Sequence, residues 1–198
     1  MGIRPEVLPF VIASVLLGAV VGGVCMFCGM TRSPSLITGG VVAVVLSAYM
    51  LFFFRDPERV VPADQALIVA GADGTIARIT EVKENEFLKT DCVRVSIFLS
   101  LFSVHVNRAP VSGTVKFVDY YPGKRYFTFQ EKSSEFNQHS SILIEGKDAR
   151  CLVNQIVGPV ARRVVYWLSV GQELRKGDRI GMMKFGSRLD MYFPKADI

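Results

Sequence analysis

Two long apolar runs open the chain and constrain its fold more than any other feature. They cover residues 10–30 and 36–54, and a short polar break that contains Pro34 separates them. A helix needs about 20 residues to cross the hydrocarbon core of a bilayer, and each run is long enough. A break of this length with a proline predicts a turn. We therefore expect residues 1–59 to form a membrane-anchoring helical hairpin with both ends on one side.

Small residues recur within both runs. Gly18 and Gly22 stand one helical turn apart, and Gly39 and Gly40 lie in the second run. Small residues let membrane helices approach closely, but glycines that simply face lipid are equally compatible with this pattern. A secretory signal is the alternative for the first run. No small-x-small cleavage site follows it and a second apolar run comes at once, so we expect the segment to be retained.

The charges that flank the apolar runs predict the orientation of the hairpin. Arg4 precedes the first run, Arg55 and Arg59 follow the second, and Arg32 lies in the turn. The positive-inside rule then places the rest of the chain on the cytoplasmic side of the cell (inner) membrane. A hairpin that enters only one leaflet would have a similar composition, so full span and re-entrant insertion both stay open.

From residue 60 onward the pattern changes to short alternating segments broken by glycine, proline or charge, which is typical of strands. The expected strands cover residues 75–82, 92–99, 113–120, 140–145, 151–157, 163–168 and 189–193. We therefore predict a mainly β (α+β) chain, in which residues 60–198 form an antiparallel β sandwich or a partly open barrel. Residues 171–181 resemble the turn and strand of lipoyl or biotinyl carrier folds in architecture.

Charge and cysteine usage bear on the possible binding partners and on disulfide bonding. The formal net charge is +5 and is spread along the chain, so no dense basic run points to nucleic acid. A diffuse positive charge does favour an anionic lipid surface. Cys25 and Cys28 lie in the first apolar run and Cys92 and Cys151 are isolated in strand-like segments, so no disulfide framework is expected.

A glycine-serine pair, Gly186-Ser187, lies close to the C-terminus. A serine hydroxyl can attack the preceding glycine carbonyl, convert the peptide bond to an ester, and lose the acyl group by β-elimination. The serine then becomes a pyruvoyl group, a ketone that forms a Schiff base with an amine and provides an electron sink for an amino-acid carboxylate. This chemistry would divide the chain into residues 1–186 and 187–198.

Five segments in one order carry a resemblance to a known family. They are residues 53–59, 72–74, 97–110, 158–163 and 184–188. Together they resemble the short phosphatidylserine decarboxylase proenzymes, the archaeal-type branch with FGSR at the cleavage point. The resemblance implies pyruvoyl-dependent decarboxylation of phosphatidylserine to phosphatidylethanolamine and carbon dioxide. It also implies a covalent pyruvoyl group from Ser187, no metal or dissociable cofactor, and a heterodimer of the α and β chains cut from one proenzyme. A larger homo-oligomer stays open.

The resemblance also implies roles for two further residues. His105 matches the first of two histidines in longer relatives and would take the serine proton, whereas Arg108 occupies the position of the second. Asp73 matches the acidic member of an Asp-His-Ser arrangement and would orient His105. An ordinary Asp-Gly turn is the alternative for Asp73.

The residues that recognise the lipid headgroup are not identified by any motif. The candidates are Arg162, Arg163, Arg125, Arg188 and His139. Guanidinium groups suit a phosphate or a carboxylate.

Two other functions use the same features. A membrane-anchored serine hydrolase would employ Ser187, His105 and Asp73, but it should show a nucleophile elbow such as G-x-S-x-G, which residues 185–189 lack. A noncatalytic lipid-associated scaffold would explain the anchor and the strands. It would not explain why the glycine-serine pair accompanies the Asp73 and His105 segments.

Overall fold

The computed structural model describes residues 2–64, 66–124, 126–128, 133–158, 164–185 and 187–198. The chain divides into two compact units, Met1–Glu58 and Arg59–Ile198. Each unit is described by itself.

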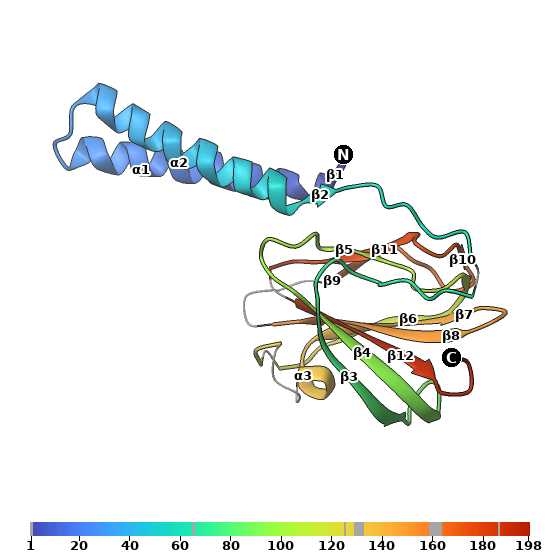
Figure 1. Ribbon diagram of the computed structural model, residues 1–198. Helices are drawn as coiled ribbons and strands as arrows, with labels where there is room; N and C mark the ends of the chain where they lie inside the picture. Colours follow the sequence, from blue (N-terminus) through green and yellow to red (C-terminus); the bar gives the residue numbers. More distant parts are fainter. Residues whose placement is uncertain (1, 65, 125, 129–132, 159–163, 186) are drawn as a thin grey trace. The chain divides into compact units, whose positions relative to one another are not determined.

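The first unit is a helical hairpin. A short 3-10 turn, η1 (Pro5–Val7), leads into α1 (Leu8–Phe27), and α2 (Arg32–Phe53) returns beside it (Figure 1). At about 1.5 Å per residue, each helix is long enough to cross a hydrocarbon core about 30 Å thick. Both helices are also apolar enough to cross a membrane. β1 (Gly2–Ile3) pairs antiparallel with β2 (Arg55–Asp56) and brings both ends of the hairpin together. The predicted hairpin is confirmed.

Glycines form the contact between the two helices. A Cβ atom added to Gly18 would lie 2.5 Å from the carbonyl oxygen of Gly39 and 2.7 Å from Cβ of Ala43. A Cβ atom on Gly22 would lie 3.1 Å from the carbonyl oxygen of Ser35, whereas one on Gly40 would meet nothing within 4 Å. Close helix packing therefore explains Gly18, Gly22 and Gly39 but not Gly40.

The second unit contains two antiparallel sheets. The seven-stranded sheet has the order β10-β6-β7-β8-β12-β4-β3, and the three-stranded sheet has the order β5-β11-β9. The strands of the large sheet are β3 (Thr75–Glu84), β4 (Thr90–Leu99), β6 (Gly113–Tyr121), β7 (His139–Glu145), β8 (Arg150–Val157), β10 (Glu173–Leu174) and β12 (Ser187–Pro194). The strands of the small sheet are β5 (Val106–Arg108), β9 (Val164–Tyr166) and β11 (Arg179–Met183). One short helix, α3 (Ser133–Phe136), precedes β7. The mainly β prediction is confirmed, and the sheets do not close into a barrel in the described part of the chain.

The core of this unit lies between the two sheets. The small sheet covers one face of the large one (Figure 1), and Leu189, Met191 and Phe193 of β12 share one hydrophobic cluster with Ile180 and Met183 of β11. We call the face of the large sheet that carries this cluster the inner face and the opposite one the outer face. Because successive strand residues point to opposite faces, the register of each strand decides which side chains are inside.

The cysteines have packing roles in this unit. Cys151 belongs to the core cluster, and burial raises the pKa of its thiol well above the usual range. All four cysteines are free.

The predicted strand ranges agree with the long strands to within a few residues. The short strands β5 and β10 were missed because two or three residues are too few to show alternation. β11 was also absent from the predicted strands and was expected only as part of the turn and strand of residues 171–181. β12 begins two residues earlier than predicted because its pairing with β4 and β8 continues back to Ser187. The proposed cleavage position is therefore the first residue of a central strand.

Candidate active site

Ser187 begins β12 between two neighbouring strands. It lies opposite Leu99 of β4 and Val157 of β8. It alternates with Arg188, so its side chain is on the inner face with that of Leu189, and its exposed fraction is 0%. The hydroxyl oxygen is buried and has no hydrogen-bond partner among the residues that the structure describes. Gly186, the other member of the predicted cleavage pair, lies outside the described residues.

The segment before Ser187 crosses from the small sheet to the large one. β11 ends at Met183, and β12 starts at Ser187. In between, Phe185 has φ of 62°, in the left-handed region that a residue with a side chain rarely adopts. Such a conformation costs roughly 1–2 kcal/mol and is common at functional sites. Backbone strain therefore lies next to the predicted cleavage pair.

Backbone pairing in the small sheet places His105 at the end of the interior where Ser187 lies. The amide of Met183 donates a hydrogen bond of 3.2 Å to the carbonyl oxygen of His105, which extends the ladder between β5 and β11 by one step. Residues opposite each other in a ladder share a face. Met183 belongs to the core cluster, so His105 also faces the interior, where its exposed fraction is 0%.

The nearby turn sets the tautomer of His105. Its Nδ1 atom lies 2.9 Å from the carbonyl oxygen of Ser103. A carbonyl oxygen only accepts hydrogen bonds, so Nδ1 carries the proton and Nε2 keeps its lone pair. Nε2 is therefore the atom of the neutral ring that can take a proton.

Asp73 has a different partner from the one predicted for it. Its Oδ1 atom accepts a hydrogen bond of 2.9 Å from Arg59 in a half-exposed ion pair. Asp73 also lines a pocket with Val106 and Arg108, which alternate with the inward-facing His105. The carbonyl of Ser103 occupies the Nδ1 side of His105, where an Asp-His-Ser arrangement would need the carboxylate. The structure brings Ser187 and His105 to one end of the interior and pairs Asp73 with Arg59.

Arg108, which was predicted to occupy the position of a second histidine, joins two loops. Its backbone amide donates to the carbonyl oxygen of Gly71 at 2.8 Å, and its guanidinium Nη1 donates to that of Gly177 at 2.9 Å. These contacts fix the loop that carries Asp73 beside β5.

Two of the candidate headgroup residues face away from Ser187. Arg188 is buried on the outer face, where its guanidinium pairs with Asp190 at 3.0 Å and donates to the carbonyl oxygen of Thr128 and to Ser134. His139 lies opposite Tyr121 and stacks on its ring, with the centroids 5.0 Å apart. Arg188 and His139 therefore lie on the face of the large sheet opposite to Ser187. The other candidates, Arg125, Arg162 and Arg163, lie outside the described residues.

Several contacts tie residues 187–198 to the rest of the unit. β12 is hydrogen-bonded on both edges, and the Arg188 contacts add a buried ionic cluster. Near the C-terminus, Arg150 binds Asp197 at 2.9 Å, and this hydrogen bond lowers the pKa of the Asp197 carboxyl. A chain cut before Ser187 would thus keep its C-terminal piece in place.

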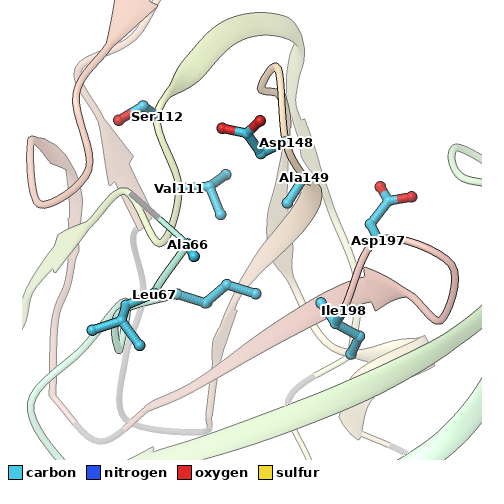
Figure 2. Close-up of a pocket in the computed structure, with 9 residues that line it drawn as sticks. Ala66, Leu67, Val111, Ser112, Asp148, Ala149, Asp197 and Ile198 are labelled. Carbon is cyan, nitrogen blue, oxygen red and sulfur yellow. The ribbon is translucent and has the colours of Figure 1, made fainter. Parts of the chain in front are cut away.

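A pocket lies away from the strand ends that carry Ser187 (Figure 2). Its lining includes Asp148, Ala149 and Asp197, close to where β8 begins and β12 ends. Ser187 pairs with the last residue of β8, so the length of that strand, about 3.3 Å per residue, separates it from this pocket. The pocket in Figure 2 is therefore distant from Ser187.

Three further polar residues of the interior, on β5, β8 and β7, were not predicted as site residues. Asn107 lies within the segment 97–110, and Gln155 and Ser140 occupy inner-face positions of β8 and β7. One sequence signal could have identified them: each is a polar residue at a strand position that alternation predicts to be buried and apolar.

Comparisons with known proteins give relatives over most of the chain. The sequence model described as phosphatidylserine decarboxylase matches residues 46–198. A phosphatidylserine decarboxylase proenzyme of Amoebophilus asiaticus is 40% identical over 182 residues, which cover 91% of this chain and 79% of that protein. The proenzyme of Carboxydothermus hydrogenoformans is 43% identical over 159 residues, covering 80% of this chain and 75% of the relative. That of Ruegeria pomeroyi is 44% identical over 161 residues, covering 79% and 74%.

The match spans the whole β-rich unit, including the Ser187 and His105 segments. Identities of this size over most of both chains establish common descent, and the chain belongs to the phosphatidylserine decarboxylase family.

Proposed function

We propose that this protein decarboxylates phosphatidylserine to phosphatidylethanolamine and carbon dioxide in phospholipid biosynthesis, after cleaving itself between Gly186 and Ser187. The observation that carries the self-cleavage proposal is the fully buried hydroxyl of Ser187, at the start of a strand and at the same end of the interior as His105. Family membership supports the reaction itself.

The alternatives explain less. A serine hydrolase should carry its nucleophile in an elbow such as G-x-S-x-G, which residues 185–189 lack. In the uncleaved chain the exposed fraction of Ser187 is 0%. Burial suits a nucleophile whose target is its own backbone. A scaffold function leaves the family relationship and the buried polar groups without an explanation.

Self-cleavage can be written with the residues of the chain. Nε2 of His105 takes the proton of the Ser187 hydroxyl as Oγ forms a bond to the carbonyl carbon of the preceding residue. The carbonyl electron pair moves to its oxygen. When this pair returns, the peptide C–N bond breaks, and the His105 proton goes to the nitrogen of residue 187. The product is an ester with a free amine.

Elimination and hydrolysis complete the change. A base removes the Cα proton of residue 187, and the bond between Cβ and the ester oxygen breaks. The upstream chain leaves as a carboxylate. The remaining enamine becomes an imine, and water converts it to a ketone with release of ammonia. No oxidant is required.

A carbonyl group at position 187 fits its surroundings. It would replace a buried hydroxyl that has no partner among the described residues. A pyruvoyl group formed there from Ser187 would supply a ketone for binding the substrate amine and an electron sink for decarboxylation. His105, on the same face, would supply or remove protons.

A carbonyl reagent tests the proposal. We expect hydroxylamine to abolish release of carbon dioxide from phosphatidylserine and to convert a ketone on the fragment 187–198 to an oxime, which adds the mass of hydroxylamine less that of the water released. Intact-mass measurement of the purified protein, before and after treatment, follows this change. The uncleaved Ser187→Ala protein is the control and should gain no mass. Decarboxylation that resists the reagent, with no carbonyl on the fragment, would exclude the pyruvoyl mechanism.

We also propose that the hairpin anchors the enzyme and that the β-rich unit lies on the cytoplasmic side. The apolar faces of α1 and α2 and the flanking Arg4, Arg55 and Arg59 support this orientation. Deletion of residues 1–58 should move the protein from the membrane to the soluble fraction while its strand content, followed by circular dichroism, is retained.

A variant of the helix contact is the control for this deletion. Gly18→Leu disturbs the contact with Gly39 but preserves hydrophobic length, so it should stay in the membrane. Equal membrane retention of the deleted protein would show that the β-rich unit binds lipid by itself. Labelling of Cys28, an exposed residue at the hairpin turn, by an impermeant thiol reagent from outside the cell tests whether the hairpin spans the bilayer.

A further inference from the structure

Three buried polar side chains form a hydrogen-bonded chain between the two sheets. Ser140 Oγ of β7 donates to Gln155 Oε1 of β8 at 2.7 Å, and Gln155 Nε2 donates to Asn107 Oδ1 of β5 at 2.6 Å. The exposed fraction of each residue is 0%. Buried polar groups are costly unless they are bonded, so this chain holds each member in a defined orientation.

One strong donor at the end of this chain is not used. Asn107 Nδ2 is buried and has no hydrogen-bond partner among the residues that the structure describes. The bond from Gln155 uses Oδ1, so the N–H groups of Nδ2 stay available for another acceptor. An unmatched buried donor typically costs about 1–3 kcal/mol, and such groups in folded proteins often serve binding or catalysis.

The strand register places this donor at the same end of the interior as His105 and Ser187. Asn107 stands two residues after His105 along an extended segment, so both side chains point toward the large sheet. Its partner Gln155 lies opposite Leu189, and the next inward residue of β8, Val157, lies opposite Ser187. Gln155 and Ser187 are therefore diagonal neighbours on one face, within reach of a further side chain.

Gly181 leaves space for this arrangement. It lies opposite Asn107 in the pairing of β11 with β5. A Cβ atom at this position would lie 2.8 Å from Gln155 Nε2 and 3.1 Å from its Oε1. A glycine is therefore needed here so that Gln155 can reach Asn107.

We propose that Asn107 is the oxyanion donor for self-cleavage at Ser187. The proposal rests on the self-cleavage described above. When Ser187 Oγ bonds to the preceding carbonyl carbon and its proton moves to His105 Nε2, negative charge develops on the carbonyl oxygen. Asn107 Nδ2 donates a hydrogen bond to that oxygen until its electron pair re-forms a carbonyl, now that of the ester. The C–N bond breaks in the same step, and the nitrogen of residue 187 takes the proton from His105.

The amide is suited to this task for two physical reasons. The amide is uncharged before and during the reaction, so its burial avoids the large free-energy cost of an unpaired charge. It is also held by Gln155 and Ser140 before the reaction, and a preorganised donor stabilises developing charge without reorientation.

Asn107→Asp is the most selective test, because it keeps the Oδ1 acceptor for Gln155 and replaces only the free donor. We expect the rate of self-cleavage to fall by about 10²–10³-fold, as for loss of one oxyanion donor. The rate is measured on gels as release of fragment 187–198 from protein translated without prior processing. Asn154→Asp is the matched control: Asn154 is next to Gln155 in β8 but lines a pocket on the outer face. It should cleave at nearly the wild-type rate.

A second pair of variants decides the question if a buried carboxyl prevents folding. Asn107→Ser and Asn107→Ala leave similar spaces, but only serine keeps a donor, so serine should cleave faster. Because an amide does not titrate, the pH midpoint of cleavage in Asn107→Ala should match that of the wild type. A shifted midpoint would instead indicate that His105 has moved.

The outcomes separate this inference from the proposed function. Wild-type protein that never cleaves would remove the proposed function. Wild-type cleavage with equal rates in Asn107→Ser and Asn107→Ala, or with Asn107→Asp as fast as the wild type, would overturn the role of Asn107 alone.

Discussion

Ser187→Ala is expected to leave the protein as one full-length chain without decarboxylase activity. Alanine has no hydroxyl to attack the preceding carbonyl, so neither the ester nor the ketone can form. Because Ser187 is a small buried residue with no hydrogen-bond partner in the described part of the chain, the substitution should not weaken the fold. Intact-mass spectrometry of the membrane-purified protein and an assay of carbon dioxide release measure both effects.

Two further variants make this result specific. Ser134→Ala alters another buried serine, one that contacts Arg188 on the outer face, and should still give the fragment 187–198. Ser187→Cys supplies a thiol that can also attack the carbonyl, so slow scission should return. If wild-type protein from active membranes remained intact, with no carbonyl at residue 187, the proposed chemistry would be wrong.

His105→Ala should slow self-cleavage by roughly 10²–10⁴-fold, the usual contribution of a positioned general base. The carbonyl of Ser103 keeps the proton on Nδ1, so Nε2 is the basic atom that the substitution removes. Release of fragment 187–198, followed over time in freshly translated protein, gives the rate. Normal scission in His105→Ala would exclude this histidine from the mechanism.

The same assay determines whether Asp73 assists His105. If Asp73 orients His105, Asp73→Asn should slow cleavage more than Arg59→Gln, although both remove the ion pair between Asp73 and Arg59. The double variant of Asp73→Asn with His105→Ala should then be little worse than His105→Ala, because groups that act as a unit do not contribute additively. Equal effects of Asp73→Asn and Arg59→Gln would assign Asp73 to the ion pair only.

Local patterns were sufficient to predict most of the fold. The lengths of the two apolar runs determine α1 and α2, and alternation determines the long strands such as β4 and β8. These signals are local because each depends on residues a few positions apart. The glycine-serine pair and its accompanying segments likewise identify the family from sequence alone.

The sequence pattern did not reveal which side chains share a site. Asp73 was expected beside His105, but its partner in the structure is Arg59, which comes from a segment that the sequence pattern leaves without a regular element. Arg188 adjoins Ser187 in sequence, yet the two side chains lie on opposite faces of β12. Asn107 was not predicted as a site residue because its hydrogen-bonded chain runs through Gln155 and Ser140, which belong to strands distant in sequence.

The sequence by itself determined the helical hairpin, the long strands and the position of Ser187 near the end of the chain. Only the tertiary structure decided that Ser187, His105 and Asn107 face one interior while Arg188 and His139 face the other side of the sheet. The physical reason is the two-residue period of a strand: a register shift of one residue would exchange the two faces, and register is set by hydrogen bonds between strands far apart in sequence.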